Sequence, residues 1–324
     1  MEVCFLASGE RVAVLDAAEL EGTTAKTVKH ALATKLGVTT FRQRLFLEGD
    51  AGEIHDDEIF PSVPLKVQLV VLEFCPPDVA EDEELMVAAR DNDTVGLEEL
   101  LKRPRNPNTR DRHGQTPLHH AAEHGHVEPM RLLLEAGAEI DAPGSQRFGE
   151  APLHWAAEGG HLEAVHFLVQ NGAQKDVLDS NGRTPLGFAA TRGHVDIARF
   201  LVLEGANKEQ LVTGNALIGA AGRGRLEMVL FLVAVGCDKD QTNEIGATPL
   251  YYAARNGHSD IVRFLAESGA SRHSMTEFGR TALDVASERG HAEVVRFLSE
   301  FEAESPPQKL RRLNSPDPLH LINI

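Results

Sequence analysis

Thr116-Pro-Leu-His-His-Ala-Ala decides the fold of this chain, because close copies of this stretch return five more times. The copies are Ala151-Pro-Leu-His-Trp-Ala-Ala, Thr184-Pro-Leu-Gly-Phe-Ala-Ala, Asn215-Ala-Leu-Ile-Gly-Ala-Ala, Thr248-Pro-Leu-Tyr-Tyr-Ala-Ala and Thr281-Ala-Leu-Asp-Val-Ala-Ser. Their first residues lie 31 to 35 positions apart. A regular period of this length is typical of proteins that stack one small structural unit many times. We number these repeat units one to six.

Each repeat unit carries the signals of two short helices. Thr before Pro-Leu is an N-cap followed by proline at the first helical position. A glycine then ends this first helix, followed by His126, His161, His194, His258 or His291, or by Arg225 in the fourth unit. The apolar cluster that comes next predicts a second, amphipathic helix closed by another glycine. No unit could bury its apolar face alone, so we expect the core to form between units.

This pattern resembles the ankyrin repeat, with six units over 109–303 and a shortened capping unit at the start of the array. The fourth unit departs most from the pattern, because it loses two residues and has Ala216 in place of the proline. The resemblance implies an all-α solenoid that holds protein partners along its concave side. There, polar turns between units, which we call fingers, and the ends of the first helices contact the partner.

Two proline pairs divide the chain into parts of different character. Pro76-Pro77 and Pro306-Pro307 cannot continue a helix or a strand ladder. We therefore predict a first domain over 1–75, a linker over 76–82, the repeats over 83–304 and a flexible tail over 305–324. In the tail, Ser305 and Ser315 precede prolines, and a short basic run leaves phosphorylation and a nuclear signal open.

The first 75 residues predict a small α+β domain. Residues 1–7 and 11–16 alternate as a hairpin, Thr23 or Thr24 can cap a helix that Gly37 ends, and two further strands follow at 44–47 and 67–74. The run from Phe41 to Gly49 resembles the ubiquitin family. This resemblance implies a β-grasp fold.

The end of this first domain differs from a conjugatable ubiquitin, which finishes in two glycines. The chain instead reads Glu73-Phe74-Cys75-Pro76-Pro77 and continues, so we expect an integral ubiquitin-like domain that is never transferred to substrates. The resemblance places Ala7, Phe46 and Val70 at the hydrophobic recognition patch of that family. The alternative is that Val70 only closes the edge of the sheet.

Composition excludes several functional classes. A net charge of −17 argues against a general nucleic-acid binder. Three cysteines cannot form a disulfide framework and suit a reducing compartment. The longest apolar stretch, Met228 to Cys237, is about half the length of a membrane span, and the first residues do not form a signal peptide. We expect a cytoplasmic protein, with the nucleus as an alternative, that has neither a membrane segment nor a nucleic-acid partner.

Catalytic and metal-binding motifs are absent from the sequence. It contains no His-Glu-x-x-His, paired Cys-x-x-Cys, phosphate-binding glycine loop or Gly-x-Ser-x-Gly. His120 and His124 lie four residues apart and could share a zinc ion. The alternative reading is structural, since His119, His126 and His154 occupy positions where the repeat itself has histidine. We predict a non-enzyme without a cofactor or a metal.

Sixteen residues at finger tips and helix ends are the predicted partner contacts. They are Arg112, His113, Gln115, Glu123, His124, Arg147, Phe148, Arg183, Arg192, Arg223, Ile245, Arg255, Asn256, Phe278, Arg280 and Arg289, with Glu150, Glu158, Ser180, Asn181, Thr191, Glu244, Glu277 and Glu288 at equivalent positions. The slot before Ala-Ala holds His120, Trp155, Phe188, Tyr252 or Val285, which we expect inside the stack.

The arginines of units three to six line up at matching repeat positions. They predict a partner with an acidic segment, because guanidinium groups bind carboxylates and phosphates through paired hydrogen bonds. The alternative is that arginine is simply a soluble helix former at these positions. The most direct function is therefore a non-catalytic scaffold for protein partners. Two other hypotheses are an adaptor of the ubiquitin–proteasome pathway that engages a ubiquitin receptor, and a regulatory subunit of a separate enzyme.

Overall fold

The computed structural model describes residues 2–5, 11–14, 24–36, 39–47, 53–56, 66–71, 79–103, 105–144, 148–208 and 216–303. These residues belong to two compact bodies, Met1–Gly144 and Ser145–Ile324, which we call the N-terminal body and the C-terminal body. The predicted tail over 305–324 and the finger of unit four lie outside the described residues.

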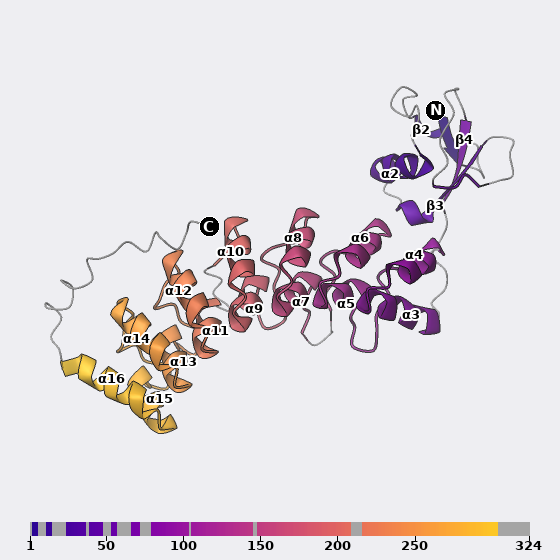
Figure 1. Ribbon diagram of the computed structural model, residues 1–324. Helices are drawn as coiled ribbons and strands as arrows, with labels where there is room; N and C mark the ends of the chain where they lie inside the picture. Colours follow the sequence, from indigo (N-terminus) through magenta and orange to yellow (C-terminus); the bar gives the residue numbers. More distant parts are fainter. Residues whose placement is uncertain are drawn as a thin grey trace. The chain divides into compact units, whose positions relative to one another are not determined.

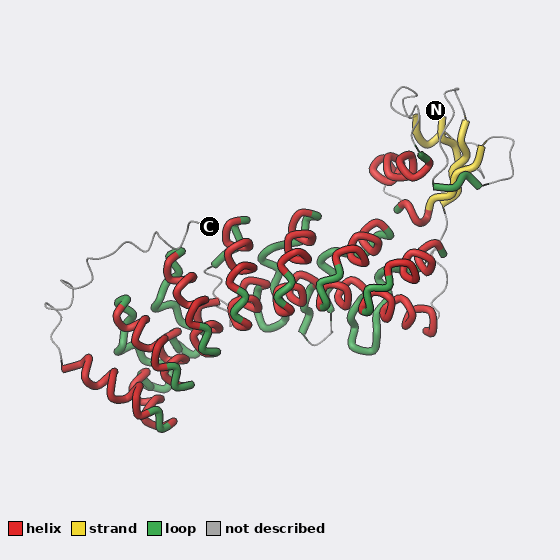
Figure 2. Tube along the Cα trace, viewed as in Figure 1, coloured by secondary structure: helices red, strands yellow, loops and turns green. Residues whose placement is uncertain are grey.

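A four-stranded sheet and a helix form the first part of the N-terminal body (Figure 2). The elements are β1 (Glu2–Phe5), β2 (Arg11–Val14), α2 (Ala25–Leu36), the 3-10 turn η1 (Thr40–Arg42), β3 (Gln43–Leu47) and β4 (Lys66–Val71). The strand order is β2-β1-β4-β3, with β1 parallel to β4 and both outer pairs antiparallel. Strands and helix lie where the sequence predicts them, whereas the β-grasp class stays a prediction.

The core of this part joins one side of α2 to alternate residues of β3 and β4. Val28 and Leu32 of α2 are fully buried together with Leu45 and Leu69, which face each other in the β3–β4 ladder. Because successive residues of a strand point to opposite faces, the neighbours of Leu45 and Leu69 lie on the other face of the sheet. This alternation decides where the predicted ubiquitin-like patch lies.

The N-terminal body continues with two helix pairs. The helices are α3 (Val79–Arg90), α4 (Thr94–Lys102), α5 (Pro117–Glu123) and α6 (Val127–Glu135). α3 packs against α5, and α4 packs against α6. Helix α3 begins at Val79, inside the stretch over 76–82 that the sequence predicts as a linker. The acidic residues at 81–84 explain the early start, because carboxylates stabilise the first turn of a helix.

Five further helix pairs, one for each of units two to six, make up the described part of the C-terminal body. The helices are α7 (Pro152–Gly159), α8 (Leu162–Gln170), α9 (Pro185–Arg192), α10 (Val195–Leu203), α11 (Ala216–Gly222), α12 (Leu226–Ala234), α13 (Pro249–Arg255), α14 (Ser259–Glu267), α15 (Ala282–Arg289) and α16 (Ala292–Ala303). The first helices, from α7 to α15, pack on one another in one row, and the second helices form another row behind them (Figure 1). The predicted pair of helices per unit is therefore confirmed.

The ends of the first helices follow the predicted signals. The hydroxyl of Thr184 accepts a hydrogen bond from the amide of Gly187 at 3.1 Å, and Pro185 is the first helical residue. Gly160 and Gly193 end α7 and α9 in the left-handed conformation, with φ of 80° and 90°. This backbone is strained for any residue with a Cβ atom, which explains why glycine recurs there.

In units three, five and six a histidine joins the unit to the one before it. Nε2 of His194 donates to the carbonyl of Glu158 at 3.0 Å, and the ring lies over Gly160, where a Cβ would be 2.6 Å from Cε1. His258 and His291 repeat this contact in units five and six. In unit four Arg225 takes the same place, with its Nε 3.4 Å from the carbonyl of Thr191.

His126 and His154, which the sequence reads as structural, bond the backbone of a neighbouring unit. His126 bonds the carbonyl of Arg90, and His154 bonds the carbonyl of Arg183, each at 3.0 Å. Nδ1 of His119 accepts a hydrogen bond from the backbone N–H of Thr116 in its own unit at 3.1 Å.

The helices of the described ranges are too short or too polar to span a lipid bilayer.

Two glycine variants separate backbone strain from the contact between units. Gly160→Ala would introduce both an alanine at positive φ and a clash with His194. Gly205→Ala would introduce the strain alone, because φ is 86° there and nothing lies within 4 Å of the added Cβ. We expect Gly205→Ala to lower the free energy of unfolding by about 1 kcal/mol, and Gly160→Ala by a further 1–3 kcal/mol or so. Urea denaturation measures both, and equal losses would contradict this role of His194.

Candidate functional site

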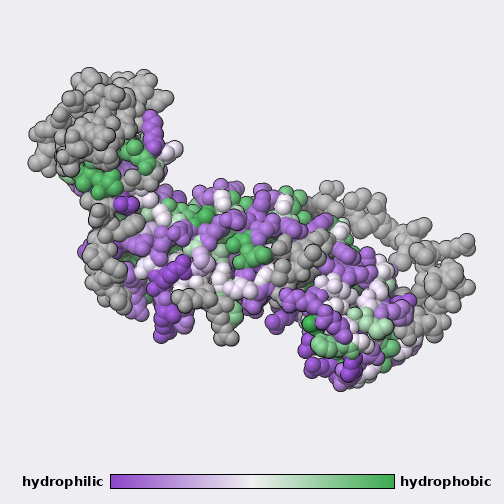
Figure 3. All heavy atoms as spheres, turned by 180° about the vertical axis from the view of Figure 1, so that it is seen from behind, coloured by the Kyte–Doolittle hydropathy of each residue, from purple (hydrophilic) through white to green (hydrophobic). Residues whose placement is uncertain are grey.

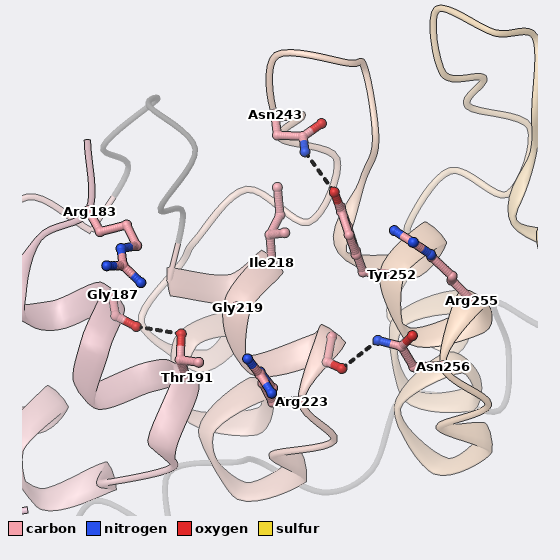
Figure 4. A pocket seen from close by; sticks show the side chains of 11 residues that line it. Arg183, Gly187, Thr191, Ile218, Gly219, Arg223, Asn243, Tyr252, Arg255 and Asn256 are labelled. Atoms are coloured by element: carbon pink, nitrogen blue, oxygen red, sulfur yellow. Dashed lines mark hydrogen bonds between the residues drawn. The ribbon is translucent and has the colours of Figure 1, made fainter. Parts of the chain in front are cut away.

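A groove on the face formed by α9, α11 and α13 gathers part of the predicted contact surface. Its volume is about 420 Å³. The lining residues are Arg183, Gly187, Thr191, Ile218, Gly219, Gly222, Arg223, Asn243, Tyr252, Arg255 and Asn256 (Figure 4). Four of the sixteen predicted contacts, Arg183, Arg223, Arg255 and Asn256, thus meet in one place. Among these lining residues there is no acidic side chain, whereas three are arginines.

The groove exists because two glycines of α11 replace larger residues of the repeat. Gly219 occupies the slot that holds Phe188 in unit three and Tyr252 in unit five, and Gly222 occupies the slot of Thr191 and Arg255. Because α11 lies between α9 and α13, the missing side chains leave space above α11 and between its two neighbours. The floor is fixed by hydrogen bonds, since Thr191 donates to the carbonyl of Gly187 at 2.8 Å and Asn256 to that of Gly222 at 2.7 Å (Figure 4).

The finger residue at the start of the turn is acidic in unit three and neutral in unit five. In unit three the buried Asp179 accepts from the amide and from Nε of Arg183, both at 2.7 Å. In unit five the equivalent residue is Asn243, which accepts from the amides of Ile245 and Ala247 and donates to the hydroxyl of Tyr252 at 3.0 Å. The amide holds the turn as the carboxylate does, without adding negative charge to the groove.

Acidic residues neutralise three of the six aligned arginines. Arg192 pairs with Glu158 of the preceding unit, with Nε 3.0 Å from Oε1. Arg183 lies 3.7 Å from Glu150 and pairs with Asp179. These contacts correct the expectation of an unbroken arginine row, because the acids of unit two are the partners of the arginines of unit three.

Unit six repeats this neutralisation, since Arg280 pairs with Glu288 of its own unit. Arg223, Arg255 and Arg289 have no carboxylate partner among the described residues. Of these three, Arg223 and Arg255 line the groove, and Arg289 is exposed in unit six. The positive charge available to a partner is therefore concentrated at units four and five.

Burial shifts the pKa of two groups beside Arg183. Burial raises the pKa of the Glu150 carboxyl, and the nearby charge of Asp179 raises it further. Burial also lowers the pKa of His154, whose Nδ1 accepts from the amide of Ala151 while Nε2 donates to the carbonyl of Arg183. This pair of bonds requires neutral imidazole, so His154 is an uncharged link between α7 and the finger of unit three.

The other predicted contacts of the C-terminal body lie on the fingers. Phe148 and Phe278 are 38 % and 74 % exposed, as expected for aromatic residues at turn tips. The amide of Glu277 donates to the carbonyl of Ile245 at 3.0 Å, so the fingers of units five and six are bonded to each other. Arg147 lies outside the described residues. On the face drawn in Figure 3, hydrophobic patches are separate and lie among hydrophilic side chains.

The predicted contacts of unit one belong to the N-terminal body. Arg112 and His113 are exposed on the finger. The backbone N–H of Gln115 donates a hydrogen bond to Oδ1 of Asp111 at 2.9 Å. Glu123 is half-buried and His124 is exposed at the end of α5. In the ubiquitin-like patch, Phe46 and Val70 are half-buried, and Ala7 lies outside the described residues.

The histidines of unit one do not gather as metal ligands. Nε2 of His120 contacts a carboxylate oxygen of Asp111 at 3.1 Å, and Nδ1 of His124 donates to the carbonyl of His120. Over the described ranges, no group of three or more His, Cys, Asp or Glu side chains could hold a metal ion. The zinc alternative at His120 and His124 therefore has no third ligand in the part that the structure describes.

The stacked helix pairs, with fingers and first helices on one face, define the class of repeat solenoids. Models of ankyrin repeats match residues 67–144 and 217–308, which is more than half of the chain, and a second such model matches 128–168 and 153–202. The chain belongs to the ankyrin-repeat family, whose repeats form a protein–protein interaction module.

A comparison with solved structures supports the same family. The ankyrin repeat domain of human ASB11 has a TM-score of 0.59 and 26 % identity, and the match covers 69 % of this chain and 98 % of that one. A comparison with curated proteins finds no match.

The state of His154 predicts how stability depends on pH. Its pKa is lowered in the folded chain, so between that value and the ordinary pKa of about 6.5 the unfolded chain binds a proton that the folded chain does not. The free energy of unfolding should therefore fall as the pH drops below about 6.5. Urea denaturation at about pH 7.5 and about pH 5.5, on either side of that value, measures the loss. It should be smaller in His154→Gln and unchanged in the control His124→Gln. Equal losses in all three proteins would contradict the prediction.

Proposed function

We propose that this protein is a non-catalytic, cytoplasmic scaffold that binds an acidic segment of a partner protein in the groove over α9, α11 and α13. The observation that carries the proposal is the composition of the lining, which contains Arg223 and Arg255, without a carboxylate partner among the described residues, and no acidic residue. A chain with a net charge of −17 thus has a local positive site on its interaction face. Carboxylates of a partner would meet guanidinium groups there in a partly enclosed, less screened setting.

The arrangement of hydrogen bonds also favours this site over the other finger positions. Asn243 lines the groove where unit three has the carboxylate of Asp179, and Arg255 has no carboxylate partner among the described residues. Arg223 is exposed, and Arg255 is half-buried beside Tyr252, with Cζ 5.9 Å from the ring centroid. A half-buried guanidinium whose orientation a ring restricts loses less entropy when it binds an anion.

Asn243→Asp tests the proposal with a change of charge alone. An aspartate can accept from the same backbone amides and from the hydroxyl of Tyr252, so we expect the fold to be retained. The added carboxylate should weaken binding of the partner several-fold, and Arg223→Glu should do so at least as strongly. Higher salt should weaken the wild-type complex, chiefly by slowing association.

The measurement is capture of partners from a lysate by the full chain, identification by mass spectrometry, and titration of the purified partner by surface plasmon resonance. Gln170→Glu is the matched control, because it adds the same charge at an exposed position at the end of α8. A partner that binds wild type, Asn243→Asp and Arg223→Glu equally would exclude the groove as the binding site.

We also propose that the first part of the chain is an integral ubiquitin-like domain through which the scaffold engages a ubiquitin receptor. A mixed sheet with a parallel central pair, β1 and β4, and one helix packed on it supports this assignment. Phe46 and Val70 both lie on the sheet face opposite to the buried Leu45 and Leu69, half-exposed, as a recognition patch requires.

Val70→Glu should abolish binding of the full chain to immobilised ubiquitin-receptor domains, because it places a charge in the centre of an apolar contact. Thr34→Glu, on the exposed side of α2, is the control and should bind as wild type does. An activating enzyme should not charge the chain, which reads Glu73-Phe74-Cys75 in place of two glycines. Receptor binding that survives Val70→Glu, or absent binding by wild type, would refute this second proposal.

A further inference from the structure

The slot before Ala-Ala forms a row of rings that is interrupted in the middle of the groove. Phe188 in unit three and Tyr252 in unit five occupy this slot on either side of Gly219. The groove of about 420 Å³ lies over Gly219, with Ile218 and Tyr252 on its walls (Figure 4). The space that remains is therefore the place of one aromatic side chain that the repeat supplies elsewhere.

Each ring beside the interruption is accompanied by an arginine. Cζ of Arg183 lies 4.3 Å from the ring centroid of Phe188, and Cζ of Arg255 lies 5.9 Å from that of Tyr252. Arg223 follows Gly219 by four residues, just beyond the end of α11, and lines the groove, but no ring accompanies it among the described residues. Unit four thus has an arginine beside the groove, at another repeat position than Arg183 and Arg255, and lacks the ring.

We infer that the groove takes up an aromatic side chain, phenylalanine or tyrosine, of the bound segment, and that this residue is flanked by a carboxylate residue. The inference rests on the proposed function and specifies the sequence that the site prefers. The ring would fill the space over Gly219, contact Tyr252, and lie under the guanidinium of Arg223. The flanking carboxylate would be bound by Arg255, which lines the groove and has no carboxylate partner among the described residues.

A side chain at position 219 could not fill this space without disturbing the floor. A Cβ on residue 219 would lie 2.6 Å from Oγ1 of Thr191, the hydroxyl that bonds the carbonyl of Gly187. Glycine is the residue that keeps both this hydrogen bond and the space above it. The groove is therefore part of the structure of α9 and α11, and an apolar group from a partner would gain contact area there against the described lining residues.

The test uses the full chain and four fluorescein-labelled synthetic peptides, the fourth with phosphotyrosine at the central position, and binding is measured by fluorescence anisotropy. The first peptide is Gly-Ser-Glu-Glu-Phe-Glu-Glu-Ser-Gly, the second has alanine in place of phenylalanine, and the third has glutamine in place of every glutamate. We expect the first peptide to bind about tenfold more tightly than the second, since loss of a central aromatic anchor typically costs this much or more. The third should bind more weakly than the first, with the difference shrinking in high salt.

Two protein variants assign the preference to the slot. Gly219→Phe combined with Thr191→Ala fills the space and removes the clashing hydroxyl, and it should bind the phenylalanine and alanine peptides equally. Arg223→Gln, an exposed change that spares the fold, should reduce the preference for phenylalanine. Arg289→Gln, at the same repeat position in unit six, is the matched control and should keep it.

The outcomes separate this inference from the function on which it rests. Equal binding of the phenylalanine and alanine peptides overturns the ring slot and leaves an acidic partner in place. A preference shown only by the fourth peptide, with phosphotyrosine at the central position, assigns the groove to a different ligand and overturns the inference as well. Absence of binding by all peptides also overturns the inference. The proposed function is tested independently, by measuring how tightly the Asn243→Asp variant binds the captured partner.

Discussion

The contact on which the repeat array depends is a hydrogen bond from one side chain to the backbone of the preceding unit. His194, His258 and His291 each bond a carbonyl at the end of a first helix and cover the glycine just beyond it. The contact requires a histidine ring in one unit and a glycine with positive φ in the preceding unit. These two positions therefore determine the spacing of neighbouring units. Arg225 shows that a longer donor can replace the ring without loss of the helix pair.

The groove arises where side chains are removed from this regular stack and not where new elements are added. Gly219 and Gly222 lower the surface of α11 between α9 and α13, which keep their larger residues. The charge of the site depends on which of the arginines have a carboxylate partner. Glu158 and Asp179 neutralise the arginines of unit three, whereas Arg223 of unit four and Arg255 of unit five have no carboxylate partner among the described residues.

Sequence periodicity predicted the helix pairs, their caps and the histidine contacts, because each depends on residues within one unit or at a constant offset. Four predicted contacts, among them Arg223 and Arg255, meet in the groove for the same reason. The pairing of Arg192 with Glu158 was not predicted, since it depends on how closely two units approach. Gly219 was visible in the sequence as the one member of its slot without a side chain, and that signal could have located the groove. In the first 75 residues the strands and the helix were predicted, and the fold class was not tested.

The residues that accept the histidine and arginine bonds have a further property. The acceptors are the carbonyls of Arg90, Glu158, Thr191, Gly222 and Arg255, and every amino acid carries the same carbonyl. Except for Gly222, these residues also carry side chains at the end of a first helix, so the identity of the side chain is independent of the bond that holds the units together. Mutation at these positions can therefore change what the array recognises without removing the hydrogen bonds between units. A duplicated unit can in the same way acquire a new binding specificity and still pack on its neighbours.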